Sequence, residues 1–276
     1  MKREIREVDP VRGILQWTGQ DERFYARQVS KDGTEENKRW DFVPSVSWIV
    51  NFYPKGEEFV RWVAKHGWDE AEQIKNAGGR RGSKVHQAIN YIVRGGTVTI
   101  SMLFENPKTG AMEELDADEY FCVMTFIDWC EKEKPQWIDA EYTVWNEYYR
   151  YAGTVDLKCR LKSTKYRVVH IIDVKTSSSV WPSMELQVSA YKHADPDAPK
   201  STQLGILQVG FKKNKKQKWR YTAVKDQFQL FLAVRKIWAK ETEGQDMPLQ
   251  REFPLSLEFV SPFANPLALT PAGGGK

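Results

Sequence analysis

The sequence predicts a protein of the α/β class, with a mixed central sheet flanked by helices and a helical layer at its N-terminal end. The chain has 276 residues, of which 41% are hydrophobic, so it can bury a large core. Helical periodicity dominates residues 45–93 and 116–135, and strand-like patterns dominate residues 137–177. The order of helices, three strands, a helix and a further strand is typical of one α/β domain.

The first elements expected are a hairpin and a short helix. Residues 22–45 alternate in polarity and turn at residues 31–33, so we expect two paired strands there. The stretch SVSWIVNFYP then predicts a short helix, capped by Ser45 or Ser47 and stopped by Pro54.

Longer helices follow. Residues 55–67 predict a helix that ends near its last residue, a glycine. The helical period continues over residues 68–93, but three glycines predict a bend or a junction of two helices there: Gly78, Gly79 and Gly82. Residues 95–115 read as a loop or weak hairpin, and residues 116–135 as an amphipathic helix.

Strands dominate the rest of the chain. Residues 137–145 and 149–161 predict a hairpin, and residues 166–177 a third strand. The later elements are a helix over 183–194, strands over 201–211 and 218–224, and a helix over 225–241.

We expect a single domain over residues 1–243, followed by an extended tail over 244–276. Its predicted parts are an N-terminal hairpin and helical layer over 1–95, a core sheet over 136–223 and a last helix over 224–243.

Composition indicates the cellular location and the redox state of the cysteines. We find no signal peptide and no run of roughly 18 apolar residues, so we expect a cytoplasmic protein that does not contact a membrane. The three cysteines form no CxxC pair, which predicts reduced thiols, two of them at helical spacing on a core face: Cys122, Cys130 and Cys159.

Positive charge is concentrated late in the chain. Residues 200–240 hold eleven Lys or Arg and one acid, a net charge of +10 in a chain of net +4. The densest part is FKKNKKQKWR. This segment is either a solvated lysine-rich turn or a surface for an anionic partner such as a nucleic acid.

The stretch HIIDVKTSSS places charge inside an apolar strand. Side chains on a strand alternate faces, so Asp173 and Lys175 point the same way and Val174 points the other way. The pair alone could be a structural salt bridge. However, Asp156 in the neighbouring strand could lie beside Asp173, and two adjacent carboxylates are best explained by a divalent cation. With a lysine beside them, these are the parts of a phosphodiester hydrolase.

The series Asp156, then Asp173-Val174-Lys175, resembles the core motif of the PD-(D/E)XK nuclease superfamily. Two further motifs match its RecB-like branch. Gln187 and Tyr191 in ELQVSAYKHA match Q-x-x-x-Y, and four-residue spacing places them on one helix face. Gly82 and His86 in RRGSKVHQAI match G-x-x-x-H. Over roughly residues 40–210 the chain resembles phage-encoded and mitochondrial genome-maintenance exonucleases.

The resemblance implies a restriction-endonuclease-like fold and a metal site. His86, Asp156, Asp173 and the backbone carbonyl of Val174 would bind Mg²⁺ or Mn²⁺, as one or two ions, and imidazole favours Mn²⁺. Lys175 would serve the attacking water, with Gln187 and Tyr191 as further catalytic residues. Some relatives hold an iron–sulfur cluster through four cysteines; this chain has three, so no cluster is expected.

Several other residues keep two interpretations. Glu141 would either support the metal ligands from behind or be a plain surface glutamate. Thr176 and Ser177 would bind a phosphate or cap a loop, and Arg80 and Arg81 would bind a phosphate or start a solvated helix. The aromatic residues of the N-terminal layer would either arch over a single strand or lie in the core: Trp40, Trp48 and Tyr53.

The function expected is metal-dependent DNA exonuclease activity, acting from DNA ends in recombination, repair or replication. The alternatives are a structure-specific endonuclease for flaps or branches, a catalytically inactive DNA-binding protein, and a small-molecule metallohydrolase. DNA is the expected partner, with a homo-oligomer or a recombination or replication protein as further options. A phage-encoded chain would work in the cytoplasm of the host cell.

Overall fold

The computed structural model describes residues 4–19, 22–30, 38–106, 109–212 and 217–245. Residues 1–243 form one compact unit and residues 244–276 form another, and every described helix and strand belongs to the first. The predicted turn at 31–33, most of the lysine-rich turn and almost all of the predicted tail lie outside the described residues.

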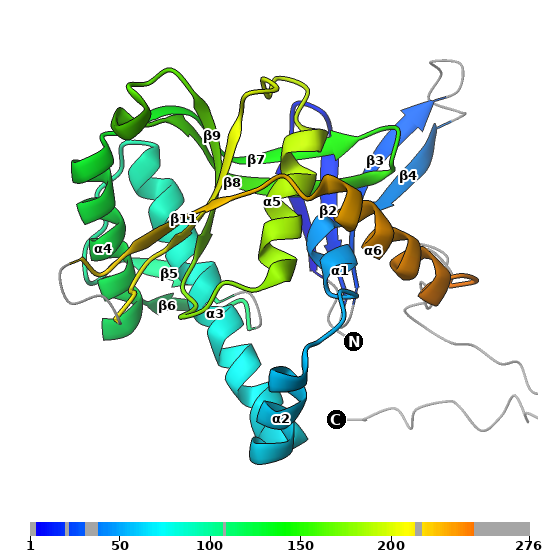
Figure 1. The fold of residues 1–276 in the computed structure, drawn as a ribbon, viewed down its shortest axis with the longest axis horizontal. Helices are drawn as coiled ribbons and strands as arrows, with labels where there is room; N and C mark the ends of the chain where they lie inside the picture. The colour runs from blue at the N-terminus through cyan, green and yellow to red at the C-terminus, as the bar shows by residue number, and fades with distance from the viewer. Residues whose placement is uncertain (1–3, 20–21, 31–37, 107–108, 213–216, 246–276) are drawn as a thin grey trace, which may run out of the picture. The chain divides into compact units, whose positions relative to one another are not determined.

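The chain begins with a four-stranded antiparallel sheet, in the order β1-β2-β3-β4 (Figure 1). Its last two strands confirm the predicted hairpin. The first two were not predicted, because no element was assigned before residue 22. The bounds are Glu4–Asp9 for β1, Ile14–Thr18 for β2, Arg23–Ser30 for β3 and Lys38–Pro44 for β4.

Three helices follow: α1 (Val46–Val50), α2 (Glu57–His66) and α3 (Trp68–Val93). Ser45 caps α1 by accepting a hydrogen bond from the Trp48 amide, and α2 ends at Gly67, as predicted. The predicted junction in α3 is wrong, because its 26 residues form one helix. A glycine costs a helix only about 1 kcal/mol relative to alanine, and burial of the second half of α3 offsets that cost.

A small hairpin, β5 (Leu103–Glu105) and β6 (Met112–Glu114), precedes helix α4 (Ala117–Glu133). Asp116 and Glu119 form a capping box at the start of α4. Cys122 and Cys130 lie on its core side, as predicted, and Cys159 is buried in the same apolar cluster. Burial raises the pKa of the Cys122 thiol to about 11.

The central sheet is mixed, with the order β11-β10-β9-β8-β7. Strand β9 pairs in parallel with β10, and the other neighbours pair antiparallel. The α/β class predicted from the sequence is therefore correct. The bounds are Gln136–Asn146 for β7, Tyr151–Arg160 for β8, Val169–Lys175 for β9, Gln203–Gln208 for β10 and Arg220–Val224 for β11.

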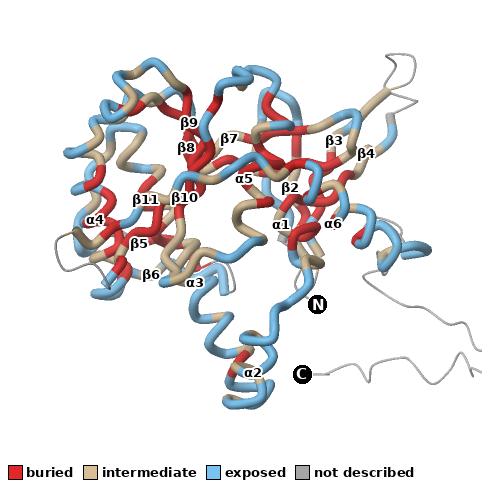
Figure 2. The backbone as a smooth tube through the Cα atoms, in the orientation of Figure 1, coloured by how far each residue is buried: buried red, intermediate tan, exposed pale blue. Residues whose placement is uncertain are grey.

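Helices cover both faces of this sheet. The second half of α3 and all of α4 pack on the face that carries Leu157, Ile172 and Val174, in one large apolar cluster (Figure 2). Because side chains alternate along β9, Asp173 points to the opposite face, where α5 (Pro182–Ala194) contacts β7 to β10. Helices α1 and α6 (Phe228–Glu241) contact α5. None of the helices in the described ranges is long and apolar enough to cross a membrane.

Candidate metal centre

Three side chains from three distant parts of the chain converge beside the central sheet. Ligand atoms of His86, Glu141 and Asp156 all lie within 4.8 Å of one another, the one such cluster among the described His, Cys, Asp and Glu residues. Nδ1 of His86 lies 3.4 Å from Oδ1 of Asp156 and 3.6 Å from Oε1 of Glu141. One imidazole and two carboxylates make a donor set that suits a divalent transition metal such as Mn²⁺.

Helix α3 fixes the position of His86. Its neighbours Val85, Ala88 and Ile89 are buried in the apolar cluster, which holds this part of the helix against the sheet. The imidazole therefore projects over the end of β9, where Nε2 lies 2.9 Å from the carbonyl oxygen of Val174. That carbonyl, predicted as a metal ligand, is thus next to the cluster and is bound by His86 in this structure.

Strands β8 and β9 separate where the site begins. Their antiparallel ladder runs from Arg160 and Val169 to Leu157 and Ile172 and stops there. Beyond this point a side chain replaces the backbone ladder as the partner of β9: Oδ2 of Asp156 accepts a hydrogen bond from the Val174 amide at 2.7 Å. Asp156 is therefore held in place with its other oxygen free to face His86.

Glu141 has an unusual backbone. Its flanking residues Ala140 and Tyr142 pair with Leu157 and Val155, so Glu141 lies opposite Asp156 in the β7–β8 hairpin. Its φ is +50°, in the left-handed region, which costs a non-glycine residue roughly 1–2 kcal/mol. Strain of this kind is concentrated at functional sites. Of the two interpretations left open for Glu141, the structure favours a role in the site.

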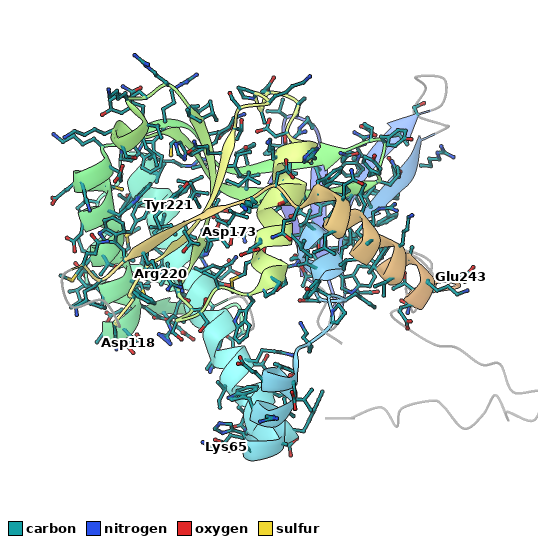
Figure 3. All side chains as sticks on the ribbon, viewed as in Figure 1. Lys65, Asp118, Asp173, Arg220, Tyr221 and Glu243 are labelled. Atoms are coloured by element: carbon teal, nitrogen blue, oxygen red, sulfur yellow. The ribbon has the colours of Figure 1, made fainter. Side chains whose placement is uncertain are left out.

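The other predicted ligand, Asp173, lies beside the cluster but does not join it. The ligand set of His86, Asp156 and Asp173 therefore stays a prediction. Nζ of Lys175 lies 2.6 Å from Oδ2 of Asp173 and neutralises it, which draws the carboxylate towards the lysine. The Asp173 side chain is 1% exposed, and apart from this ion pair its oxygens have no partner among the described residues. Figure 3 shows Asp173 at the centre of the described unit, beside α5.

The electrostatics of the cluster call for positive charge. Burial acts to lower the pKa of His86, but the Asp156 and Glu141 carboxylates raise it well above its usual 6.5. Burial raises the pKa of Asp173 to about 6; Lys175 opposes the rise and Asp156 adds to it. Without an ion, protonated His86 and Lys175 therefore supply the cationic charge that these buried carboxylates need.

Helix α5 adds the two residues that the Q-x-x-x-Y resemblance indicated. Nε2 of Gln187 donates a hydrogen bond of 2.6 Å to the hydroxyl of Tyr191, and both side chains line the same cavity as the acidic cluster. Gly153 makes room for them, since a Cβ there would lie 2.5 Å from Cε1 of Tyr191. The sequence indicated this pair, but the need for glycine at 153 depends on the tertiary contact.

The cavity has a volume of about 610 Å³, and Glu141, Asp156, Asp173 and Lys175 all line it. Its opposite side is formed by the N-terminal sheet, and sequence reasoning missed this contribution to the site. The residues that this sheet contributes are Arg6, Glu7, Val8, Gln16, Thr18, Arg23 and Tyr25.

The predicted phosphate-binding residues lie outside this cavity. Arg80, Arg81, Thr176 and Ser177 do not line it, and the Ser177 hydroxyl donates to the Ser179 carbonyl, as in the loop interpretation. The described part of the basic segment 200–240 also contributes nothing to its lining. Arg220, for example, donates to Gln208 and lies over the Phe211 ring.

Of the two interpretations of the N-terminal aromatic residues, burial in the core is the correct one for Trp48. It is buried and lies between Phe24 and Trp238, with ring centroids 4.8 and 5.1 Å away. An arch that uses Trp48 is therefore wrong. Trp40 and Tyr53 are partly buried, and Trp40 packs against Phe42.

Comparison with known proteins adds no assignment. No protein-family model matches the chain, and no curated protein matches it.

Proposed function

We propose that this protein is a divalent-metal-dependent deoxyribonuclease that hydrolyses phosphodiester bonds from DNA ends. The observation that supports this proposal most directly is the convergence of His86, Glu141 and Asp156 within 4.8 Å, in the same cavity as Asp173 and Lys175. A purely structural ion pair would need one acid and one base. Here three acids and two bases meet in a site that is open to a ligand.

The residues present fit a metal ion. His86, Glu141 and Asp156 would hold it, with the Val174 carbonyl next to them, and Mn²⁺ suits this mixed nitrogen and oxygen donor set. A bound divalent ion would stabilise negative charge on the phosphate and make water more acidic. The left-handed backbone at Glu141 supports the same assignment, since the strain has no benefit in a plain surface glutamate.

Lys175 is placed to act on the substrate. Its ammonium lies 2.6 Å from Asp173, and 21% of its side chain is exposed. Burial acts to lower its pKa, but the charges of Asp173 and Asp156 outweigh burial and raise it. The lysine therefore stays protonated and can orient a water or a phosphate oxygen by hydrogen bonding. Tyr191 and Gln187 contribute further polar groups to the lining of the same cavity.

The arrangement of strands supports a restriction-endonuclease-like fold in particular. Asp156 lies on β8, and Asp173 and Lys175 lie on the adjacent strand β9 of a mixed sheet, followed by α5 with Gln187 and Tyr191. This is the order that the resemblance to PD-(D/E)XK nucleases implies. We infer from it a role in DNA recombination, repair or replication.

A structure-specific endonuclease is the second candidate, because the same site would serve both reactions. The experiment that tests the proposal incubates the purified chain with end-labelled linear, covalently closed circular and single-stranded DNA in Mn²⁺. We expect linear DNA to be degraded and closed circles to survive. Cleavage of circles would favour the endonuclease.

Two variants make the assay specific for the site. Asp173→Ala should abolish cleavage, whereas Asp128→Ala, an exposed acid on α4, should leave it unchanged. Full activity in Asp173→Ala would contradict the proposed site. DNA binding without any cleavage by the wild-type chain would instead support the inactive DNA-binding protein.

A further inference from the structure

The N-terminal sheet presents two unpaired cations to the cavity. Among the described residues, three lysine or arginine side chains line this cavity: Arg6, Arg23 and Lys175. Lys175 is held by Asp173. Arg6 and Arg23 are exposed, and within the part of the chain that the structure describes neither side chain forms a hydrogen bond or a salt bridge. Their guanidinium groups are therefore available to a ligand.

Strand pairing places both arginines on one face. Arg6 of β1 pairs with Gln16 of β2, and Gln16 pairs with Tyr25 of β3. Paired residues of antiparallel strands share a face, and so do residues two apart, which places Arg23 on the face that carries Tyr25. This face is polar and looks into the cavity. We refer to it, by Arg6, Gln16, Thr18 and Arg23, as the arginine wall.

The arginine wall is fixed to the catalytic sheet. The Tyr25 hydroxyl lies 3.0 Å from the Thr154 hydroxyl and accepts a hydrogen bond of 2.8 Å from Gln16. Thr154 is two residues from Asp156 on β8. The Thr143 hydroxyl of β7 donates to the Val8 carbonyl of β1 at 3.3 Å. Because these contacts hold the two sheets together, the arginines keep a set position relative to the acidic cluster.

The reverse face of the same sheet is committed to the core. Phe24 is 4% exposed and packs edge-on against Trp48. Trp17 is 6% exposed and packs edge-on against Phe42. A one-residue slip would exchange the faces and bury the arginines, so the register is strongly specified. Burial of the reverse face therefore directs the polar face towards the cavity.

We propose that the arginine wall binds the backbone phosphates of a single DNA strand and holds that strand across the acidic cluster. This inference rests on the proposed nuclease function and names the form of its substrate. Arginine offers paired donors that match a phosphate, and within the described residues no salt bridge occupies the guanidinium of Arg6 or Arg23. A cavity of about 610 Å³ is within the range of sites that hold one small ligand, a size that suits a single strand better than a duplex.

Salt dependence of binding measures phosphate contacts directly. Each phosphate neutralised on a single strand contributes about 0.7 to the slope of log affinity against log salt. The probe is a fluorescein-labelled oligothymidine of about 12 nucleotides, within the length that a single-strand site covers. Binding is followed by anisotropy in EDTA, which prevents cleavage, for the wild type and for the double variant Arg6→Gln/Arg23→Gln.

The matched control is Arg39→Gln, an exposed arginine on β4 of the same sheet that does not line the cavity. We expect the double variant to lower the slope by about 1.4, for two lost phosphate contacts, and the control to leave it unchanged. Arg6→Lys/Arg23→Lys should restore most of the slope, since lysine keeps the charge.

Equal slopes in the wild type and the double variant would overturn the inference, and so would an equal loss in Arg39→Gln, which would indicate net charge alone. Cleavage of DNA by the wild-type chain distinguishes a failure of the arginine-wall proposal from a failure of the nuclease proposal. If the wild type cleaves DNA but the slopes are equal, only the arginine wall fails. If it neither binds nor cleaves DNA, both proposals fail.

Discussion

Glu141 and Asp156 face each other across the β7–β8 hairpin, and the glutamate reaches this position through a left-handed backbone. The two carboxylates share one imidazole between them. Like charges opposite one another on a sheet are destabilising, and the left-handed conformation adds to that cost. Stability has therefore been given up here for a particular arrangement of acids.

Substitution at Glu141 should separate stability from metal binding. Glycine adopts a positive φ freely, so Glu141→Gly should be more stable than Glu141→Ala by about 1 kcal/mol, or roughly 2–4 °C in Tm. Both variants should lose affinity for Mn²⁺, because both lack the carboxylate. Thermal melts and calorimetric titration with Mn²⁺ measure the two effects. Equal melting temperatures would show that the backbone at 141 is not strained.

Gly153 and Gly78 form a second matched pair. Gly153→Ala should destabilise the protein by roughly 1–3 kcal/mol, because its Cβ would lie 2.5 Å from the Tyr191 ring. Gly78→Ala should stabilise it by about 1 kcal/mol, since Gly78 lies in helix α3 with nothing within 4 Å of its Cβ position. Urea unfolding gives both values. A neutral Gly153→Ala would mean that Tyr191 does not pack on β8.

His86 should be needed for metal binding, whereas another helical histidine should not. We expect His86→Ala to weaken Mn²⁺ binding at least tenfold, in line with loss of one ligand of three. His66→Ala is the control, because His66 pairs with Glu70 on the exposed surface of α2 and α3. Calorimetry on the apo protein measures both. Unchanged affinity in His86→Ala would remove the histidine from the site.

The link between the two sheets should depend on pH. Burial acts to raise the pKa of Asp41, but hydrogen bonds and charge from Arg150, and then Arg27, lower it below its usual 3.8. The ionised acid therefore favours the folded state. Its contribution is complete above the unfolded pKa near 4 and is lost as the pH falls through the folded value.

Asp41→Asn should accordingly lower the free energy of unfolding at pH 7 and have little effect near pH 3. Urea titrations at both pH values test this, with Asp128→Asn as the exposed control. A deficit in Asp41→Asn that is equal at both pH values would show that Asp41 does not act through its charge.

The sequence predicted the elements whose pattern is local. Helix α4 carries its own capping box and periodicity, and β7 to β9 are apolar and rich in branched side chains. Gln187 and Tyr191 were indicated by their resemblance to the Q-x-x-x-Y motif, and their four-residue spacing placed them on one helix face. Strands β1 and β2 were missed, because most of β1 is exposed and charged, and its partner strand is only five residues long.

Residues whose role depends on distant contacts could not be predicted in the same way. The sequence of Glu141 gives no sign of a positive φ, since that conformation is imposed by the hairpin around it. Arg6 and Arg23 resemble ordinary surface arginines until the two sheets are brought together. Asp173 is a case in which the motif gave more than the structure shows. The motif indicated a metal ligand, but Asp173 pairs with Lys175 and lies beside the cluster.

Val174 serves the site only through its main chain. Its amide holds Asp156, its carbonyl meets His86, and its side chain is buried in the apolar cluster on the other face of the sheet. The middle letter of the acid-x-lysine motif is thus chosen by core packing, and any apolar residue of similar volume would leave the chemistry intact. Proline is excluded for a further reason, because it would delete the amide that donates to Asp156.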